Sequence, residues 1–310
     1  MKVFIVGNIA MDQTIGIDRF PNEGESIFGS RVSLDLGGKG ANQAIVLGRS
    51  GVPTILIAAV GTDLQSQHMR DLLAKEPVVS RLIKRHDCAS DTTVVLKDAA
   101  GGNANIATVD CARSVDLIDV LPLMADAVAG DLLVLQGNLQ LSTTADLIAQ
   151  ARKQQMLVAF NPSPFDREFI PLLPSLDILF LNEHEAEQIT GKADEAAVYH
   201  LLDMNIATVV LTLGARGALL GQRDAARGSD IVAVPAHKCH VVDSTGAGDT
   251  LQSVTIGSAI LRGSKICAHD LDLAVRAAAI TVTRPGTTAA FPTQQELETL
   301  SRKLEVPLNL

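Results

Sequence analysis

Apolar residues along the chain fall into short runs that predict buried strands. Each run has four to six mostly apolar residues, and the runs are residues 3–6, 55–60, 132–135, 157–160, 178–181 and 208–213. Segments with helical spacing lie between or after them, at residues 63–75, 143–153, 183–190, 196–204, 270–283 and 294–303. Strands that alternate with helices pair in parallel and carry helices on both faces of the sheet. The pattern therefore predicts an α/β fold with a mostly parallel central sheet.

Two regions, residues 12–36 and 90–112, fall outside this rhythm. They contain short β-like runs, at residues 15–17, 26–36, 92–97 and 105–109, separated by glycines and Pro21. The last two runs flank Gly101-Gly102, which predicts a hairpin. We expect these regions to be insertions that form a small separate sheet within one domain spanning residues 1–310.

A glycine-rich turn, residues 243–250, is the first candidate for chemistry. An apolar, strand-like run ends at Val242, and an apolar segment follows from residue 251 to 261, so we expect strand, turn and helix. The first N–H groups of a helix have no intrahelical partner and carry a positive partial charge. With only Gly246, Ala247 and Gly248 there, an anion can approach these groups, and Asp249 follows in the first helical turn.

An anion site beside a carboxylate suits phosphoryl transfer. The N–H groups would stabilise charge on the moving phosphoryl group, and Asp249 would take the proton of the attacking hydroxyl. The pattern alone leaves an alternative open. Asp249 is also explained as a helix-start carboxylate that the macrodipole favours, with glycines that only permit a tight turn.

A second glycine motif, Gly37-Gly38-Lys39-Gly40-Ala41-Asn42, precedes a helical segment at residues 44–50. Its backbone, Lys39 and Asn42 suit a polyhydroxylated ligand. The spacing is neither that of a Walker A loop nor that of a dinucleotide fingerprint. By itself the motif is equally explained as a turn into a helix.

Composition narrows the class of protein. The 310 residues are 47% hydrophobic, the net charge is −9, and no basic run appears, so we expect no nucleic-acid partner. No apolar run reaches about 18 residues, the length of a membrane span, so we expect no membrane partner. The cysteines, at 88, 111, 239 and 267, show no Cys-x-x-Cys spacing, which favours reduced thiols and a cytoplasmic location.

Five motifs together resemble the signatures of the ribokinase-like (PfkB) carbohydrate kinase family. They are the segments 37–44, 182–185, 212–217, 243–250 and 283–286, and the resemblance extends in order from about residue 2 to 303. Gly38-to-Ala44 and Asn161-Pro162-Ser163-Pro164 look closest to the ribokinase branch. The resemblance implies a mostly parallel sheet with a small β-sheet lid, formed by the two insertions. It also implies transfer of the γ-phosphate from MgATP to a sugar hydroxyl, and a homodimer through the lid.

The resemblance assigns roles residue by residue. Asp249 matches the general base, and Gly246, Ala247 and Gly248 match the anion hole. The sugar-site matches are Asp12, Gly38, Lys39, Asn42 and, in a looser alignment, Asn138. The nucleotide-site matches are Asn182, Glu185, Thr212, Gly214 and Gly217, with Glu185 organising Mg²⁺ through water. Asp243, Thr245, Thr281, Arg284 and Gly286 match a monovalent-cation site, which leaves activation by K⁺ open.

Two of these residues have simpler explanations. Glu185 is also expected as a first-turn carboxylate after Asn182 as N-cap, and Asp12 as an ordinary turn residue.

The sequence departs from the family pattern at several positions. Ala10 stands where ribokinases have an asparagine, and Asn138 aligns with a sugar-binding glutamate. These changes argue against ribose and leave a deoxy sugar, another furanose, a sugar acid or a nucleoside open. Ser253 replaces a glycine, so we expect it to shift the nucleotide pocket. Ala290 replaces a hydroxyl near the cation, so K⁺ activation should be weaker. The alternatives are a nucleoside kinase of the same family and a non-catalytic sugar sensor.

Overall fold

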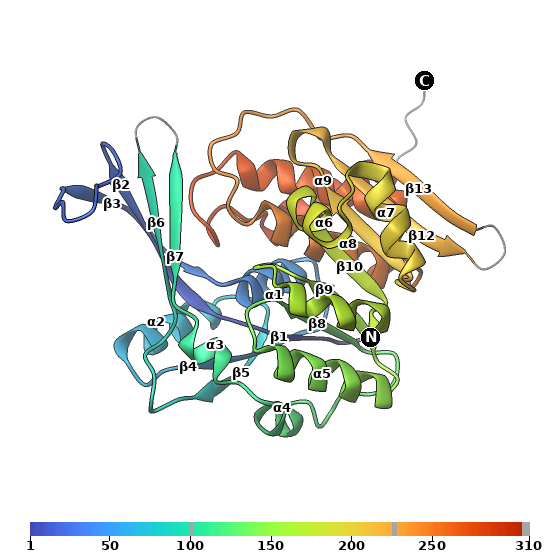
Figure 1. Ribbon diagram of the computed structural model, residues 1–310, viewed down its shortest axis with the longest axis horizontal. Coiled ribbons are helices and arrows are strands. Elements are labelled where there is room, and N and C mark those ends of the chain that lie inside the picture. The colour runs from blue at the N-terminus through green and yellow to red at the C-terminus, as the bar shows by residue number, and fades with distance from the viewer. Residues whose placement is uncertain (99–101, 225–227, 306–310) are drawn as a thin grey trace.

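A computed structural model describes residues 1–98, 102–224 and 228–305 and contains two β-sheets (Figure 1). The larger sheet has nine strands in the order β13-β12-β11-β10-β9-β8-β1-β4-β5, and the smaller has four in the order β3-β2-β6-β7. Neighbours in the larger sheet pair in parallel from β5 to β11, and only β12 and β13 pair antiparallel. The predicted fold, a mostly parallel sheet with a small β-sheet lid, is confirmed.

All six strands predicted for the central sheet are present. They are β1 (Val3–Val6), β4 (Thr54–Val60), β8 (Leu132–Gln136), β9 (Leu157–Asn161), β10 (Ile178–Asn182) and β11 (Thr208–Thr212). Three strands were not predicted: β5 (Val79–Lys84), β12 (Ala218–Asp224) and β13 (Gly228–Val234). They form the two ends of the sheet, and in β5 partial exposure mixes polar residues into the strand and weakens the apolar signal.

Helices cover both faces of the central sheet. The longer ones are α1 (Lys39–Arg49), α2 (Leu64–Leu73), α5 (Leu141–Lys153), α6 (Glu183–Thr190), α7 (Asp194–Asp203), α8 (Ala247–Arg262), α9 (Ala268–Val282) and α10 (Gln294–Glu305). The shorter ones are α3 (Asp110–Arg113), α4 (Leu117–Leu123) and the 3₁₀ segments η1 (Arg167–Ser175) and η2 (Gly214–Arg216). Alternate residues of β1 enter different cores: Val3 and Ile5 pack with α1, α8 and α9, whereas Phe4 and Val6 pack with α5, α6 and α7.

The smaller sheet extends from one end of the molecule (Figure 1). Its strands are β2 (Ala10–Ile17), β3 (Gly29–Gly37), β6 (Thr92–Asp98) and β7 (Asn103–Ala107). β6 and β7 pair antiparallel as the predicted hairpin requires, while Gly101 of its turn lies outside the described residues. We call this four-stranded sheet the lid.

The chain order of the strands places a ligand site at one edge of the central sheet. After β1 the chain builds β4 and β5 on one side of it and then β8 to β11 on the other. In such sheets, ligands bind outside the carboxyl ends of the strands, where the order reverses. That point here lies between β1 and β8, and the lid begins at Ala10, three residues after Gly7 at the end of β1.

One predicted strand is wrong. β13 ends at Val234, and no strand is assigned from there to the start of α8. Val241 and Val242 are 60% and 52% exposed. The N–H of Val242 donates to the carbonyl of Val282 at 2.7 Å, so this segment is fixed to the end of α9 instead of to a sheet. In the described part of the chain, no helix is long and apolar enough to cross a membrane.

Candidate active site

The glycine turn ahead of α8 has the backbone that an anion site needs. Gly246 adopts a left-handed conformation, with φ 75°, and a Cβ there would lie 2.5 Å from the ring of Phe291. A Cβ on Gly248 would meet no atom within 4 Å, so the first turn of α8 faces open space. The first N–H groups of a helix have no intrahelical partners, which makes them available to an anion in that space, although the N–H of Ala247 also donates to the carbonyl of Ser244 at 3.3 Å.

Asp249 lies in this first turn and is buried. Its Oδ2 accepts a hydrogen bond from Nδ2 of Asn42 at 2.9 Å, and its Oδ1 accepts one from Nε2 of Gln43 at 3.0 Å. Both donors are on α1. The structure therefore joins the two glycine motifs, although they lie more than two hundred residues apart in the sequence.

Two further glutamines support this contact and were missed by the sequence analysis. Oε1 of Gln43 accepts from Nε2 of Gln136 at 2.8 Å and from Nε2 of Gln252 at 3.3 Å. All three glutamines are at most 1% exposed. Their amides fix the orientation of Gln43 and so hold the Asp249 carboxylate. The position of Gln136, directly after four apolar strand residues, was the available signal.

Ser253 is a buried residue in the first half of α8. Its hydroxyl donates to the carbonyl of Gln43 at 3.1 Å, within the contact between α1 and α8, and it does not line the cavity described below. The expectation that Ser253 shifts the nucleotide pocket stays a prediction, and such an effect would have to pass through the contact between α1 and α8. The whole first half of α8 is buried, and both Ser253 and its neighbour Gln252 face α1.

Five buried side-chain oxygens in the described part of the chain have no hydrogen-bond partner. They are Oδ1 of Asp12, Oδ1 of Asn42, Oε1 of Gln136, Oδ1 of Asn138 and Oδ1 of Asn161. Buried polar atoms normally have partners, so such a set indicates a place where a polar ligand binds. Three of these residues were predicted sugar contacts. Gln136 and Asn161, which end β8 and β9, were not.

Asp12 is on β2, at the base of the lid. Burial raises its pKa to about 6, hydrogen bonds from Thr93 and Thr287 partly oppose the rise, and the charges of Asp35 and Asp249 add to it. The Thr287 hydroxyl donates to Oδ2 of Asp12 at 3.1 Å. Asp12 is thus a strand residue with a buried carboxyl, so its description as an ordinary turn residue is wrong.

Gly38 and Lys39 place α1 against the end of β1. Gly38 has φ 88°, and a Cβ there would lie 2.9 Å from the backbone of Ile9. The N–H of Gly40 reaches Oδ1 of Asn8 at 3.3 Å. Lys39 is the first residue of α1 and lines the same cavity as Asp249, which places a cation beside the anion-accessible turn.

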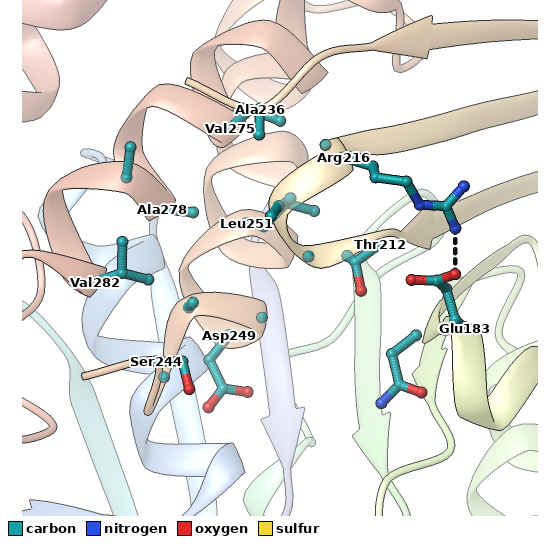
Figure 2. Close-up of a pocket in the computed structure, with 18 of the residues that line it drawn as sticks. Glu183, Thr212, Arg216, Ala236, Ser244, Asp249, Leu251, Val275, Ala278 and Val282 are labelled. Atoms are coloured by element: carbon teal, nitrogen blue, oxygen red, sulfur yellow. Dashed lines mark hydrogen bonds and ion pairs between the residues drawn. The ribbon is translucent and has the colours of Figure 1, made fainter. Parts of the chain in front are cut away.

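A cavity of about 1280 Å³ adjoins the first turn of α8. All five predicted nucleotide-site residues line it, namely Asn182, Glu185, Thr212, Gly214 and Gly217. Figure 2 shows Ser244 and Asp249 at one end, while Leu251, Val275, Ala278 and Val282 form an apolar wall. Arg216 forms an ion pair with Glu183 at the edge of the cavity (Figure 2). A polar end joined to an apolar wall suits a ligand with a phosphate group and a flat apolar base.

Glu185 has the first-turn capping position that its simpler explanation expects. Its N–H donates to Oδ1 of Asn182 at 2.9 Å, and its Oε2 accepts from the N–H of Asn182 at 2.9 Å, which is a complete capping box. It also lines the cavity. No group of three or more acidic, histidine or cysteine side chains that could hold a metal exists in the parts of the chain described. Mg²⁺ keeps several waters and binds through one or two carboxylates and substrate phosphates, so Glu185 fits that ion.

The residues matched to a monovalent cation do not fit one. Oδ1 of Asp243 accepts from the N–H and hydroxyl of Thr245 at 3.1 and 2.7 Å. Its Oδ2 accepts from Nζ of Lys97 at 2.5 Å and from the N–H of Gly286 at 3.3 Å. The Thr281 carbonyl accepts from the N–H of Arg284 at 3.2 Å. Both carboxylate oxygens of Asp243, the charged ligand that a cation would need, are therefore occupied by groups of the protein.

The Asp249 carboxylate, the anion-accessible turn beside it and the adjoining cavity form a small-molecule site of the kind that kinases have, and comparison with known proteins gives the family. The pfkB family carbohydrate kinase profile matches residues 1–294, so the chain belongs to that family. This match confirms the predicted family. It also confirms, at the level of the family, the prediction of an ATP-dependent sugar kinase.

Individual relatives agree with this assignment. A ribokinase of Haemophilus influenzae is 29% identical over 94% of this chain and 95% of its own length. A deoxyribokinase of Salmonella typhi is 26% identical over 96% of this chain and 97% of its own. The solved structure of a ribokinase from Giardia lamblia has a TM-score of 0.86 and 26% identity, covering 97% of this chain and 98% of that one.

Proposed function

We propose that this protein transfers the γ-phosphate of ATP to a hydroxyl of a small sugar, with Asp249 as the general base. The observation that supports the proposal most directly is the position of the Asp249 carboxylate. It lies in the first turn of α8, is oriented by Asn42 and Gln43, and lines the nucleotide cavity. Among the unpartnered oxygens of the predicted sugar site, that of Asn42 lies on α1 beside Asp249, that of Asp12 on β2, and that of Asn138 in the turn after β8.

Different residues of the chain have different roles in an in-line transfer. The polar oxygens near Asp12 and Asn138 bind and orient the sugar, and Asp249 accepts the proton of its hydroxyl. The N–H groups of Gly246, Ala247 and Gly248 stabilise the charge that develops on the transferred group, and Lys39 adds a positive charge nearby. Glu185 would hold Mg²⁺ beside the bound ATP, and the ion would neutralise charge on the phosphate oxygens.

The sugar site supports a substrate other than ribose. Ala10 is 1% exposed and offers no hydrogen bond where ribokinases have an amide, and Asn138 offers an amide in place of a carboxylate. A substrate hydroxyl that loses its hydrogen-bonding partner is left unpaired, so the loss of one such group from the site changes which hydroxyl pattern binds best. We favour a deoxy sugar or another furanose, and one relative of this chain is named a deoxyribokinase.

The test is an ATP-consumption screen with Mg²⁺ against pentoses, hexoses, deoxy sugars and nucleosides. For the sugar that is turned over, we expect Asp249→Asn to lower kcat by roughly 10²–10⁴-fold, the range of a general base. Asp203→Asn, an exposed carboxylate on α7, is the matched control. Near-normal turnover by Asp249→Asn would refute the assignment. Preference for nucleosides would indicate a nucleoside kinase, and sugar binding without turnover a sensor.

We further propose a homodimer through the outer face of the lid. Leu34 and Ile106 share one register row with Gln13 and Val94, and this row is adjacent to the one that contains Asp12. Because successive residues of a strand alternate between faces, the row of Leu34 faces away from the site. Leu34 and Ile106 are 43% and 63% exposed, and exposed apolar rows of this kind mark interfaces.

Sedimentation equilibrium tests this interface. We expect a dimer for the wild type and a monomer for Leu34→Asp with Ile106→Asp. Ile118→Asp is the control, because Ile118 is 79% exposed and is on α4, which lies away from the lid sheet (Figure 1). A wild-type monomer, or a dimer unaffected by the lid substitutions, would contradict the proposal.

A further inference from the structure

Lys97 brings a positive charge from the lid to the loop that leads into α8. Its Nζ lies 2.5 Å from Oδ2 of Asp243, and the side chains are 30% and 8% exposed. Thr93, Val95 and Lys97 alternate onto one face of β6, and Thr93 pairs with Asp12 in register. Lys97 therefore extends from the lid face that carries Asp12.

Asp243 connects three segments of the chain. Besides Lys97, its carboxylate accepts from Thr245 in its own loop and from the N–H of Gly286 in the loop after α9. Burial alone would raise the pKa of Asp243, but the bonds from Lys97 and Thr245 outweigh it and hold this pKa below its usual value. These contacts hold the carboxylate tightly, three residues before Gly246.

We propose that the Lys97 ammonium replaces a free monovalent cation at this position and ties the lid to the loop ahead of the anion hole. The proposal rests on the proposed kinase function. The described residues around Asp243 leave no carboxylate oxygen for a free ion, and Ala290, fully buried, supplies no hydroxyl ligand. Lys97 is a positioning residue, since its partner is Asp243 and not a reacting atom.

Because the Lys97 ammonium is covalently attached to the lid, the site does not have to take up a cation from solution. The ammonium is present at a high effective concentration wherever the lid covers the site, so its effect does not depend on the salt in solution. Removing it leaves a buried carboxylate without its charge partner, which is costly in a folded protein. A soluble cation of suitable size then gains a place to bind. Phosphoryl transfer by the wild type should consequently need no K⁺.

The experiment compares KCl with tetramethylammonium chloride at equal ionic strength, for the wild type, Lys97→Met and the control Lys84→Met. Lys84 is an exposed residue of β5. Two quantities are measured: kcat on the sugar identified above, and the melting temperature without substrate.

For the wild type and Lys84→Met, we expect neither quantity to depend on K⁺. For Lys97→Met, we expect kcat to fall by about 10- to 100-fold, the effect of a displaced site, with partial recovery in KCl. We also expect a K⁺-specific rise in its melting temperature.

Activation of the wild type by K⁺ would overturn the inference. So would a Lys97→Met variant that is fully active without K⁺, or one whose melting temperature and turnover both ignore K⁺. The melting temperature needs no substrate. A failure to find a sugar would therefore count against the proposed function and leave this measurement intact.

Discussion

At the scale of single residues, Asp12, which we propose binds the sugar, has a buried carboxyl that lowers the stability of the fold. Its carboxyl is buried, Oδ1 has no partner, and its pKa is raised to about 6, chiefly by burial. Because the folded pKa lies above the unfolded value of 3.8, folding favours the protonated acid. This favourable contribution is complete below the unfolded pKa and is lost as pH rises through about 6.

We therefore expect Asp12→Asn to be more stable than the wild type at about pH 8, by on the order of 1–3 kcal/mol, and to lose this advantage at about pH 4. The same variant should bind sugar poorly, because an amide replaces the carboxylate. Urea unfolding at both pH values measures the first effect, and sugar titration the second. Asp18→Asn, an exposed lid carboxylate, is the control. A variant that is less stable at the higher pH contradicts the pKa argument.

At the scale of elements, the start of α8 contains two glycines, and only one of them has space for a side chain. A Cβ on Gly248 meets open space, whereas a Cβ on Gly246 meets Phe291 and a left-handed backbone. We expect Gly248→Ala to fold with normal or slightly higher stability, since alanine suits a helix better than glycine. Its kcat should nevertheless fall by about 10- to 100-fold, because the methyl group takes the space of a phosphoryl oxygen.

Melting temperature and kcat, measured together, separate these effects. Gly246→Ala is the matched variant, and it should lose stability first, through strain and the clash with Phe291. Normal turnover by Gly248→Ala would show that the first turn of α8 does not contact the transferred group.

The same helix shows how far the sequence could predict the structure. Its start and the position of Asp249 followed from glycines and an apolar run, both of which are local signals. The strand proposed to end at Val242 was wrong because two apolar residues in an exposed loop have the same pattern as a short strand. The contact of Gln43 with Asp249 was not predictable, since amides have no diagnostic spacing and their partners lie more than two hundred residues away.

At the scale of the whole molecule, the site exists only because distant segments converge on one edge of the sheet. β1 and β8 contribute strand ends, α1 and α8 contribute the two glycine motifs, and the lid contributes Asp12 and Lys97. Local patterns identified most of these segments separately. Their convergence follows from the reversal of strand order between β1 and β8, which motifs alone did not reveal.

The cavity formed in this way is lined by a cysteine whose alkylation can report nucleotide binding. Cys239 is exposed and lines it, whereas Cys111 is buried beside Cys88, and burial raises the pKa of the Cys111 thiol. Thiolates are the reactive form, so iodoacetamide should alkylate Cys239 well before Cys111. If the cavity binds nucleotide, MgATP at tenfold its dissociation constant should slow this alkylation by about tenfold.

Mass spectrometry of peptides, sampled over time with and without MgATP, measures the alkylation of each cysteine separately. Cys267, partly buried at the start of α9 and outside the cavity lining, is the internal control, and its rate should not change with MgATP. Equal protection of Cys239 and Cys267 would indicate a general tightening of the fold. Protection of Cys239 alone would place the nucleotide between the loop at residues 235–246 and α9, where Val275 and Ala278 form the apolar wall. Absence of protection at a concentration that saturates turnover would move the nucleotide out of this cavity.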